Sequence, residues 1–245
     1  MEQLELTTEI LADPARLLAL DEVAVDFTEA TGRELLWLWE SPRPWVVVGL
    51  GQAVTVEVNW DFCRQRETPV LRRCSGGGAV VQGPGCLNYA VTLRMDRDPA
   101  LGAVTTTNAW VMERLRRVIQ GQSAYEIAVQ GHTDLAFRDG VDWRKFSGNA
   151  QRRRRSALLF HGTMLHAFDL SQIADCLRHP SAEPSYRAGR SHREFVANLP
   201  VGGKTLKAVL TECWATGAVA GDFPWKDVET LAERRYRSAD WNLRR

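Results

Sequence analysis

Apolar and polar residues alternate along the chain with two different spacings. In residues 14–30, apolar residues recur every three or four positions with acidic residues between them, which predicts an amphipathic helix covering one face of a sheet. Residues 35–40 and 45–50 are short runs rich in β-branched and aromatic residues, and the Ser-Pro-Arg-Pro between them predicts a turn. The chain is therefore expected to open with a covering helix followed by a pair of strands.

A glycine-rich turn divides the next group of predicted strands. Residues 70–73 lead into Gly76-Gly77-Gly78, and the chain leaves through Ala79-Val80-Val81, which predicts a strand, glycine loop, strand unit. Further strands are expected at 88–93, 124–129, 134–137 and 157–166, and helices at 107–119 with Asn108 as cap, 171–177 and 206–216. A very basic connection is expected at 152–155 and a polar tail at 232–245.

This order of elements predicts an α+β fold with a mixed sheet, in one domain covering residues 1–245. Lysine and arginine number 31 and aspartate and glutamate 30, so the net field expected of a general nucleic-acid binder is missing. The N-terminus lacks a secretory signal, and no apolar run approaches the roughly 20 residues of a membrane span. No membrane contact and a cytoplasmic location are therefore expected.

The cysteines and histidines do not predict a metal site. No C-x-x-C pair occurs, which favours reduced structural thiols over zinc or redox chemistry. His161 and His166 are five apart in a predicted strand and therefore face opposite sides, which argues against a shared ligand. Both histidines are expected to be structural, as are the five cysteines Cys63, Cys74, Cys86, Cys176 and Cys213.

The triple-glycine segment is a candidate anion site. Consecutive glycines allow left-handed dihedral angles and close approach of a ligand, and successive free N–H groups in such a turn form a cavity for anions. Arg73 and Ser75 flank the turn with a guanidinium and a hydroxyl. The structural alternative is a flexible hairpin or barrel corner. The segment is neither a Walker loop nor a G-x-G-x-x-G dinucleotide fingerprint.

Lys145 is the second candidate, in the sequence Arg-Lys-Phe-Ser-Gly-Asn-Ala that ends at Ala150. A lysine held between an aromatic and small residues can neutralise a substrate carboxylate and a phosphate together. Taken alone, such a lysine is more often a solvated surface charge. The interpretation depends on combining it with the glycine segment and with residues 131–135 and 161–165.

Taken together, these motifs resemble the catalytic domain of lipoate-protein ligases, within the family that also includes biotin ligases and octanoyltransferases. The resemblance covers nearly the whole chain and implies a mixed, largely antiparallel sheet covered by helices, as in class II aminoacyl-tRNA synthetases. The matching segments are GLGQ at 49–52 with EVN at 57–59, RRCSGGGAV at 72–80, GHTDL at 131–135, RKFSGNA at 144–150, HGTML at 161–165, RSHREFVANL at 190–199 and SADWN at 238–242.

The resemblance implies a role for each matching residue. Lys145 would bridge the acyl carboxylate and the α-phosphate of ATP, Arg73 would bind the phosphates, and residues 78–81 would contact nucleotide through their backbone. Asp134 would support metal or nucleotide binding. The implied binding set is Arg73, Ser75, Gly76, Gly77, Gly78, Ala79, Val80, Val81, Asp134 and Ala150.

The implied reaction is ATP-dependent activation of lipoate or octanoate to acyl-AMP, with Mg2+ expected, followed by transfer to a lysine of a lipoyl carrier domain of the 2-oxoacid dehydrogenase E2 or glycine cleavage H protein type. Two features depart from the family. The chain ends just after Trp241 and Asn242, without the C-terminal accessory domain of larger members, so a separate accessory subunit is a candidate partner. Residues 82–86 read QGPGC where ligases often show HDxGN.

Two other functions are kept as alternatives. Octanoyl or lipoyl transferases of this fold use a cysteine nucleophile instead of ATP, and Cys176 is the available thiol, although a structural role is favoured. Cys74 is interpreted as a loop-packing residue. A non-catalytic subunit that binds lipoyl domains is the other alternative, against which the retained Arg73, Ser75 and Lys145 argue. Residues 151–155 are expected to form a solvated loop or one facing an acidic carrier.

Overall fold

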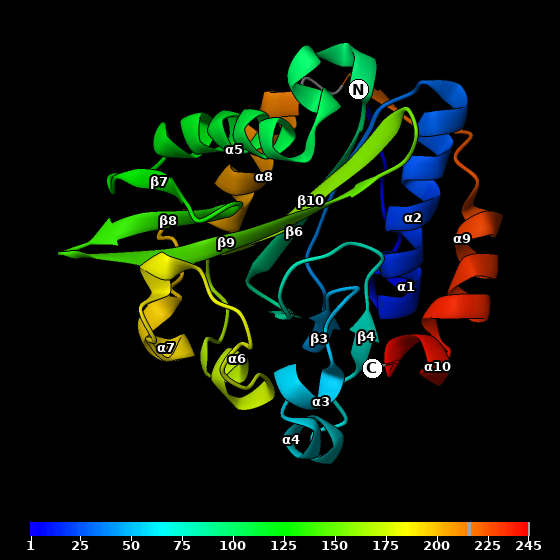
Figure 1. Cartoon of the computed structure of the whole chain (residues 1–245). Coiled ribbons are helices and arrows are strands. Elements are labelled where there is room, and N and C mark those ends of the chain that lie inside the picture. Colours follow the sequence, from blue (N-terminus) through cyan, green and yellow to red (C-terminus); the bar gives the residue numbers. More distant parts are fainter. Residues whose placement is uncertain (215–216, 245) are drawn as a thin grey trace.

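An eight-stranded sheet forms the centre of the computed structural model, which describes residues 1–214 and 217–244 (Figure 1). Its strand order is β11-β1-β2-β6-β10-β9-β8-β7, parallel from β11 to β2 and antiparallel elsewhere. The predicted α+β fold with a mixed, largely antiparallel sheet is therefore confirmed. The strands are β1 Glu2–Gln3, β2 Leu35–Trp39, β6 Cys86–Arg94, β7 Ile127–Gln130, β8 Asp134–Asp139, β9 Asp142–Arg153, β10 Ala157–Leu165 and β11 Ala218–Val219.

Helices cover both faces of this sheet. Side chains alternate along β2, so Leu35 and Trp37 join the core formed with α2, whereas Leu36 joins the core formed with α5 and α8. The expected first helix is confirmed as α2, which Asp13 caps by accepting from two backbone N–H groups and which Gly32 ends at a φ of 71°. No described helix is long and apolar enough to cross a membrane. The covering helices are α2 Pro14–Thr31, α5 Val104–Gln120, α8 Gly203–Trp214 and α9 Trp225–Leu231.

A second, three-stranded sheet carries the glycine loop. Its order is β4-β3-β5, with β4 (Val70–Arg72), β3 (Trp45–Val48) and β5 (Val80–Gln82). The expected strands on either side of the loop are confirmed, but the expected pairing of residues 35–40 with 45–50 is wrong. All four β3 side chains are buried, and the strand packs between the main core and the short helices below it, so a two-stranded hairpin would leave one apolar face in water. Those helices are α3 Val54–Glu57, α4 Trp60–Gln65, α6 Ser171–Cys176 and α7 His192–Phe195.

The remaining differences concern charged segments. Strand β9 takes in Arg152 and Arg153 of the basic connection expected at 152–155, and the chain leaves the strand at Arg154. Arg153 donates to the carbonyl oxygens of Leu101 and Gly102, and Arg154 pairs with Glu22 and Asp26. Of the loop expected at 151–155, residues 151–153 are therefore strand and Arg155 is exposed, while a carrier-facing role stays a prediction. Asn108 is not a cap, since α5 begins at Val104.

The C-terminal region also differs from expectation. The polar tail expected from residue 232 instead forms the π-helical turn Ala232–Tyr236 and α10 (Ala239–Asn242), with Tyr236 and Asn242 buried. The end of the helix expected at 206–216 falls partly on residues 215 and 216, outside the described part. The other short elements are α1 Thr8–Leu11, η1 Met95–Arg97, η2 Pro99–Gly102 and η3 Ser185–Arg187.

Arg72 joins the small sheet to this C-terminal region. Its fully buried guanidinium donates to the carbonyl oxygens of Gly49 at 2.8 Å and Gln52 at 2.7 Å on one side. On the other side it donates to the carbonyl oxygens of Trp241 and Arg244, and the Asn242 side chain accepts from the Arg72 backbone N–H at 2.9 Å. The start of the glycine loop is therefore fixed by segments about two hundred residues apart along the chain.

We expect Arg72→Met to lower the free energy of unfolding by at least about 3 kcal/mol, because several buried carbonyl oxygens lose their donor together. Urea denaturation followed by tryptophan fluorescence measures the change. Arg43→Met, at an exposed position, is the control and should have little effect. Equal stability of the two variants would show that the carbonyl oxygens find other donors.

Candidate functional site

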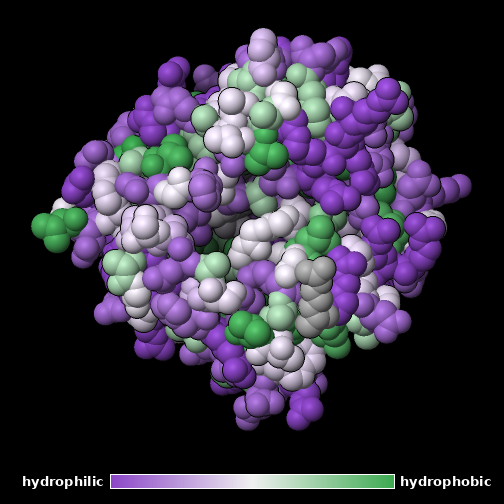
Figure 2. All heavy atoms as spheres, in the orientation of Figure 1, coloured by the Kyte–Doolittle hydropathy of each residue, from purple (hydrophilic) through white to green (hydrophobic). Residues whose placement is uncertain are grey.

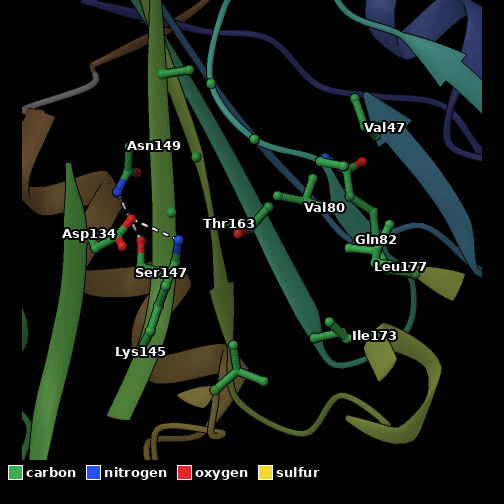
Figure 3. A pocket seen from close by; sticks show the side chains of 18 of the residues that line it. Val47, Val80, Gln82, Asp134, Lys145, Ser147, Asn149, Thr163, Ile173 and Leu177 are labelled. Atoms are coloured by element: carbon green, nitrogen blue, oxygen red, sulfur yellow. Dashed lines mark hydrogen bonds and ion pairs between the residues drawn. The ribbon is translucent and has the colours of Figure 1, made fainter. Parts of the chain in front are cut away.

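A cavity of about 510 Å³ lies where the two sheets meet, and it opens as a hollow near the middle of the face shown in Figure 2. The glycine loop and β5 form one wall, β8 and β9 form another, and the connection between α6 and α7 crosses the opening. Gly77 and Lys145 both line it, and a Cβ placed on Gly77 would lie 3.8 Å from Cβ of Ala150. The two segments singled out in the sequence therefore meet at one cavity (Figure 3).

The glycine loop turns its carbonyl oxygens toward Arg73. The guanidinium donates to the oxygens of Gly76 and Gly78, and its Nε also donates to Ser75 Oγ at 3.0 Å. Gly77, at a φ of 87°, places its own oxygen so close to Gly49 that a Cβ on Gly49 would lie 2.0 Å away. Within the described chain, no hydrogen bond is donated by the N–H groups of the three loop glycines. Successive amides that are free in a turn can together bind an anion.

Arg73 is itself almost fully buried, and burial lowers its pKa to about 10, so it remains charged at neutral pH. Arg73 lines the cavity, and its side chain donates hydrogen bonds to the glycine loop.

A chain of side-chain hydrogen bonds connects the glycine loop to α2. Ser75 Oγ accepts from Arg73 Nε, lies 2.6 Å from His161 Nε2 and can donate to it, and His161 Nδ1 lies 2.7 Å from Asp21 Oδ2. Ser75 is 1% exposed and one lone pair of its oxygen is engaged by Arg73, so this Ser-His-Asp arrangement orients the loop rather than presenting a nucleophile. His161 was expected to be structural, and its hydrogen bonds to Ser75 and Asp21 agree with that, but it also lines the cavity.

Lys145 reaches the cavity because β9 is irregular beside it. Ala136 of β8 pairs with Lys145 while Leu135 pairs with Ser147, so Phe146 is skipped and turns into the core. Lys145 Nζ lies 2.8 Å from Asp134 Oδ1 (Figure 3) and passes over Gly148, where a Cβ would come within 3.0 Å of it. Its side chain is 26% exposed, so the ammonium faces the cavity while keeping one anionic partner.

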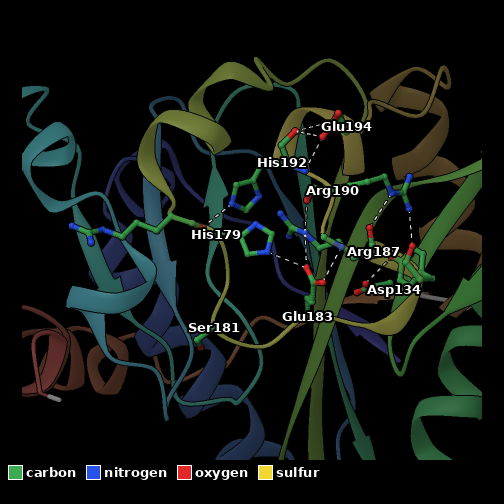
Figure 4. Close-up of polar contacts among 12 residues, drawn as sticks. Asp134, His179, Ser181, Glu183, Arg187, Arg190, His192 and Glu194 are labelled. Carbon is green, nitrogen blue, oxygen red and sulfur yellow. Dashed lines mark hydrogen bonds and ion pairs between the residues drawn. The ribbon is translucent and has the colours of Figure 1, made fainter.

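The connection across the opening, residues 178–191, is here called the strap (Figure 4). Glu183 contacts three other residues of the strap. Its carboxylate lies 3.1 Å from His179 Nε2 and 3.3 Å from Arg187 Nε, and it accepts a hydrogen bond from the backbone N–H of Gly189. The hydroxyl of Ser181 donates a hydrogen bond to the buried carboxylate of Glu57 in α3. The strap thus adds cationic and anionic groups to the mouth of the cavity.

Most of the expected binding set lies in the cavity wall, and two members do not. Ser75 lies behind the wall, where it supports the loop, and Gly76 is exposed on the loop outside the lining. The sequence missed Asp21 and Glu57, because a buried acid has no signature without knowledge of its partner. The expected residues in the lining are Arg73, Gly77, Gly78, Ala79, Val80, Val81, Asp134, Lys145 and Ala150.

The thiols are buried. All five cysteines are free and buried, as expected of structural residues. A hydrogen bond with Cys63 together with burial raises the pKa of the Cys176 thiol, and burial raises the pKa of Cys74 to about 12. Neither thiol is therefore suited to act as a nucleophile at neutral pH.

The described residues contain no group of three or more metal-ligating side chains. Asp134, the candidate for metal support, has one oxygen beside Lys145 and the other bonded to the Tyr186 hydroxyl at 2.9 Å. This carboxylate therefore already has a cationic partner, and its expected support of a metal stays a prediction.

The sequence matches the family model of the lipoyl protein ligase A/B catalytic domain over residues 13–207. The chain belongs to this family, which confirms the resemblance seen in its motifs. Lipoate-protein ligase LplJ of Bacillus subtilis is 26% identical over 95% of this chain and 71% of its own length. Lipoate-protein ligase 1 of Staphylococcus aureus is 27% identical over 96% of this chain and 71% of its own length.

Solved structures show the same fold. A bi-partite lipoate protein ligase described with its E2 lipoyl domain, from Thermoplasma acidophilum, superposes with a TM-score of 0.83 at 22% identity, covering 99% of this chain and 95% of that one. A T. acidophilum putative ligase with bound lipoic acid gives 0.81 at 20% identity, covering 99% and 98%. A lipoate-protein ligase A bound with ATP gives 0.76 at 23% identity, covering 99% and 98%.

We expect His161→Leu to lower the free energy of unfolding by about 2–4 kcal/mol, because Asp21 would be left buried without its donor. Adding Ser75→Ala to that variant should cost little more, since the chain of hydrogen bonds is already broken. Chemical denaturation of both single variants and the double variant measures this coupling, with His132→Leu as a control at an exposed position. Additive losses would show that Ser75 and His161 act separately.

Proposed function

We propose that this chain activates lipoate, or the related octanoate, with ATP to form acyl-AMP and transfers the acyl group to a lysine of a lipoyl carrier domain. One observation carries the proposal: Gly77 and Gly78, whose N–H groups donate no hydrogen bond to any described residue, line the same cavity as Lys145. Two kinds of donor that favour anions therefore converge on a single space.

The walls of the cavity fit both parts of an acyl-adenylate. Leu17, Trp39 and Val47 line the side near α2, where an acyl chain can leave water, and Ile173 and Leu177 line the side near the small sheet. Arg73, Arg178 and Arg187 place further cations on the lining. Relatives of the same fold have been solved with lipoic acid and with ATP.

The chemistry follows from these positions. A carboxylate oxygen attacks the α-phosphorus of ATP, the bond to the β-phosphate oxygen breaks, and pyrophosphate leaves. Lys145 has N–H groups to donate to both reacting anions, and the loop amides are preorganised to stabilise charge on the phosphate. In the second step a carrier amine attacks the acyl carbonyl and AMP leaves, with the amine proton lost to solvent. Mg2+ is proposed only as a companion of the triphosphate oxygens.

The proposed carrier is a lipoyl domain of the E2 type, because a ligase of this fold has been described with its E2 lipoyl domain. We also propose that carriers of the glycine cleavage H protein type are substrates. The proposed location of the protein is the cytoplasm. A separate accessory subunit is a further proposed partner, since that same relative is described as bi-partite.

The cysteine-dependent transferase is the second candidate, and the structure disfavours it. Cys176 is 2% exposed, and its raised pKa keeps the thiol protonated at neutral pH. A non-catalytic carrier-binding subunit would have no need for the cluster formed by the loop amides and Lys145.

Incubation of the purified chain with ATP, lipoate and an apo lipoyl domain tests the proposal. We expect ATP-dependent modification of the domain, and at least about a hundredfold loss of adenylate formation in Lys145→Ala, because the developing charge loses its main neutralising partner. Pyrophosphate release and carrier mass measure the two steps. Lys204→Ala, an exposed lysine, and Cys176→Ser are the controls and should remain active.

Three outcomes separate the alternatives. Transfer from an octanoyl carrier without ATP, lost in Cys176→Ser, would establish the transferase. Carrier binding with neither reaction, even after addition of an accessory subunit, would establish the binding module. An active Lys145→Ala protein would contradict the assignment of the lysine.

We expect Gly148→Ala to reduce kcat/KM for adenylate formation about tenfold, because the new Cβ would lie 3.0 Å from Lys145 Nζ and displace it. The flexible lysine can move aside, so the thermal midpoint should change little. Steady-state kinetics and a thermal melt measure both effects, and Gly202→Ala, where an added Cβ meets nothing within 4 Å, is the control. Full activity would show that Lys145 does not act from this position.

A further inference from the structure

Tyr186 links the strap to the lysine of the site. Its hydroxyl donates to Asp134 Oδ2 at 2.9 Å, while Asp134 Oδ1 faces Lys145 Nζ at 2.8 Å. One carboxylate thus lies between a donor from the strap and a donor from β9. Figure 4 shows Asp134 beside the strap residues, and Figure 3 shows it beside Lys145.

Contacts that do not involve its hydroxyl hold the Tyr186 ring in place. The ring packs against Phe195 with centroids 5.0 Å apart, and Arg190 donates to the Tyr186 carbonyl oxygen at 2.8 Å. Burial raises the pKa of Tyr186 well above its usual range, so the hydroxyl keeps its proton. The position of the Tyr186 hydroxyl is therefore fixed, and around neutral pH the hydroxyl keeps the proton that it donates.

A second donor changes what Asp134 can do. A carboxylate with one partner can rotate about its terminal bond and carry that partner with it, whereas donors at both oxygens fix its plane. Lys145 has three N–H groups, and the direction in which two of them face the cavity depends on where the third is bound. The side chains of Asp134 and Lys145 are 13% and 26% exposed, so the lysine is the more accessible of the two.

We propose that Tyr186 is a positioning residue for the reaction, which fixes the Asp134 carboxylate so that the Lys145 ammonium faces the reacting anions. This inference rests on the proposed function, because it assigns Lys145 the role given there. Tyr186 does not contact the reacting atoms; it acts through Asp134. Strand β9 is sufficient to deliver the lysine to the cavity, and the strap supplies its orientation.

Tyr186→Phe tests this with the ring retained. We expect kcat for adenylate formation to fall about tenfold, with the KM for ATP within twofold, because one hydrogen bond to a charged group is lost while the ring is retained. In an Asp134→Asn background the same substitution should have no further effect. Tyr125→Phe, at a tyrosine that is 41% exposed and also packs on an aromatic ring, is the matched control.

Crystal structures of the parent and Tyr186→Phe proteins test the inference without any activity. We expect the Asp134 carboxylate to rotate and the Lys145–Asp134 contact to lengthen in the variant, with β8 and β9 unmoved. An unchanged contact, or a loss in kcat that persists undiminished in the Asp134→Asn background, would overturn the inference. A parent protein that forms no adenylate would refute the proposed function instead, while the crystal structures would still decide the role of Tyr186.

Discussion

Two adjacent arginines determine the conformation of the glycine loop. Arg73 binds the carbonyl oxygens of Gly76 and Gly78, and Arg72 fastens the start of the loop to the backbone of residues 49–52 and 241–244. Because the carbonyl oxygens are turned toward a cation, the amide N–H groups between them remain available for an anion. A triple-glycine turn without these contacts would sample many conformations, and the cost of ordering it would fall on ligand binding.

Two buried acids of α2 have hydrogen-bonding partners of their own. Asp21 reaches the loop through His161 and Ser75, and Glu22 accepts from Arg235 and from the Tyr236 hydroxyl. Each acid has a hydrogen-bonding partner that offsets part of the free-energy cost of burying its carboxylate. Two adjacent acids can therefore lie on the buried face of the helix. The same helix therefore serves two purposes, since its apolar residues complete the core and its acids support the site.

The sequence predicted the fold class, the covering helix, the glycine loop between two strands, and the convergence of that loop with Lys145. Local spacing is sufficient for these features. It did not predict that β2 and β3 would enter different sheets, because that choice depends on burial of both faces of β3. It also missed strand β9, because the arginines at its end suggest a loop until the carbonyl oxygens that accept from Arg153 are known. The roles of Asp21 and Tyr186 depend on contacts across more than fifty residues, which no local pattern contains.

The reach of Arg72 has a consequence for biosynthesis. Its partner Asn242 lies 170 residues further along the chain. A ribosome that adds about 5–20 residues per second needs roughly ten to thirty seconds to cover that interval. During that time the contacts between Arg72 and residues 241–244 cannot form. The guanidinium of Arg72 then stays hydrated or makes temporary contacts. In nascent chains arrested before residue 241, the glycine loop should therefore be less ordered even when the strands around it are already in place.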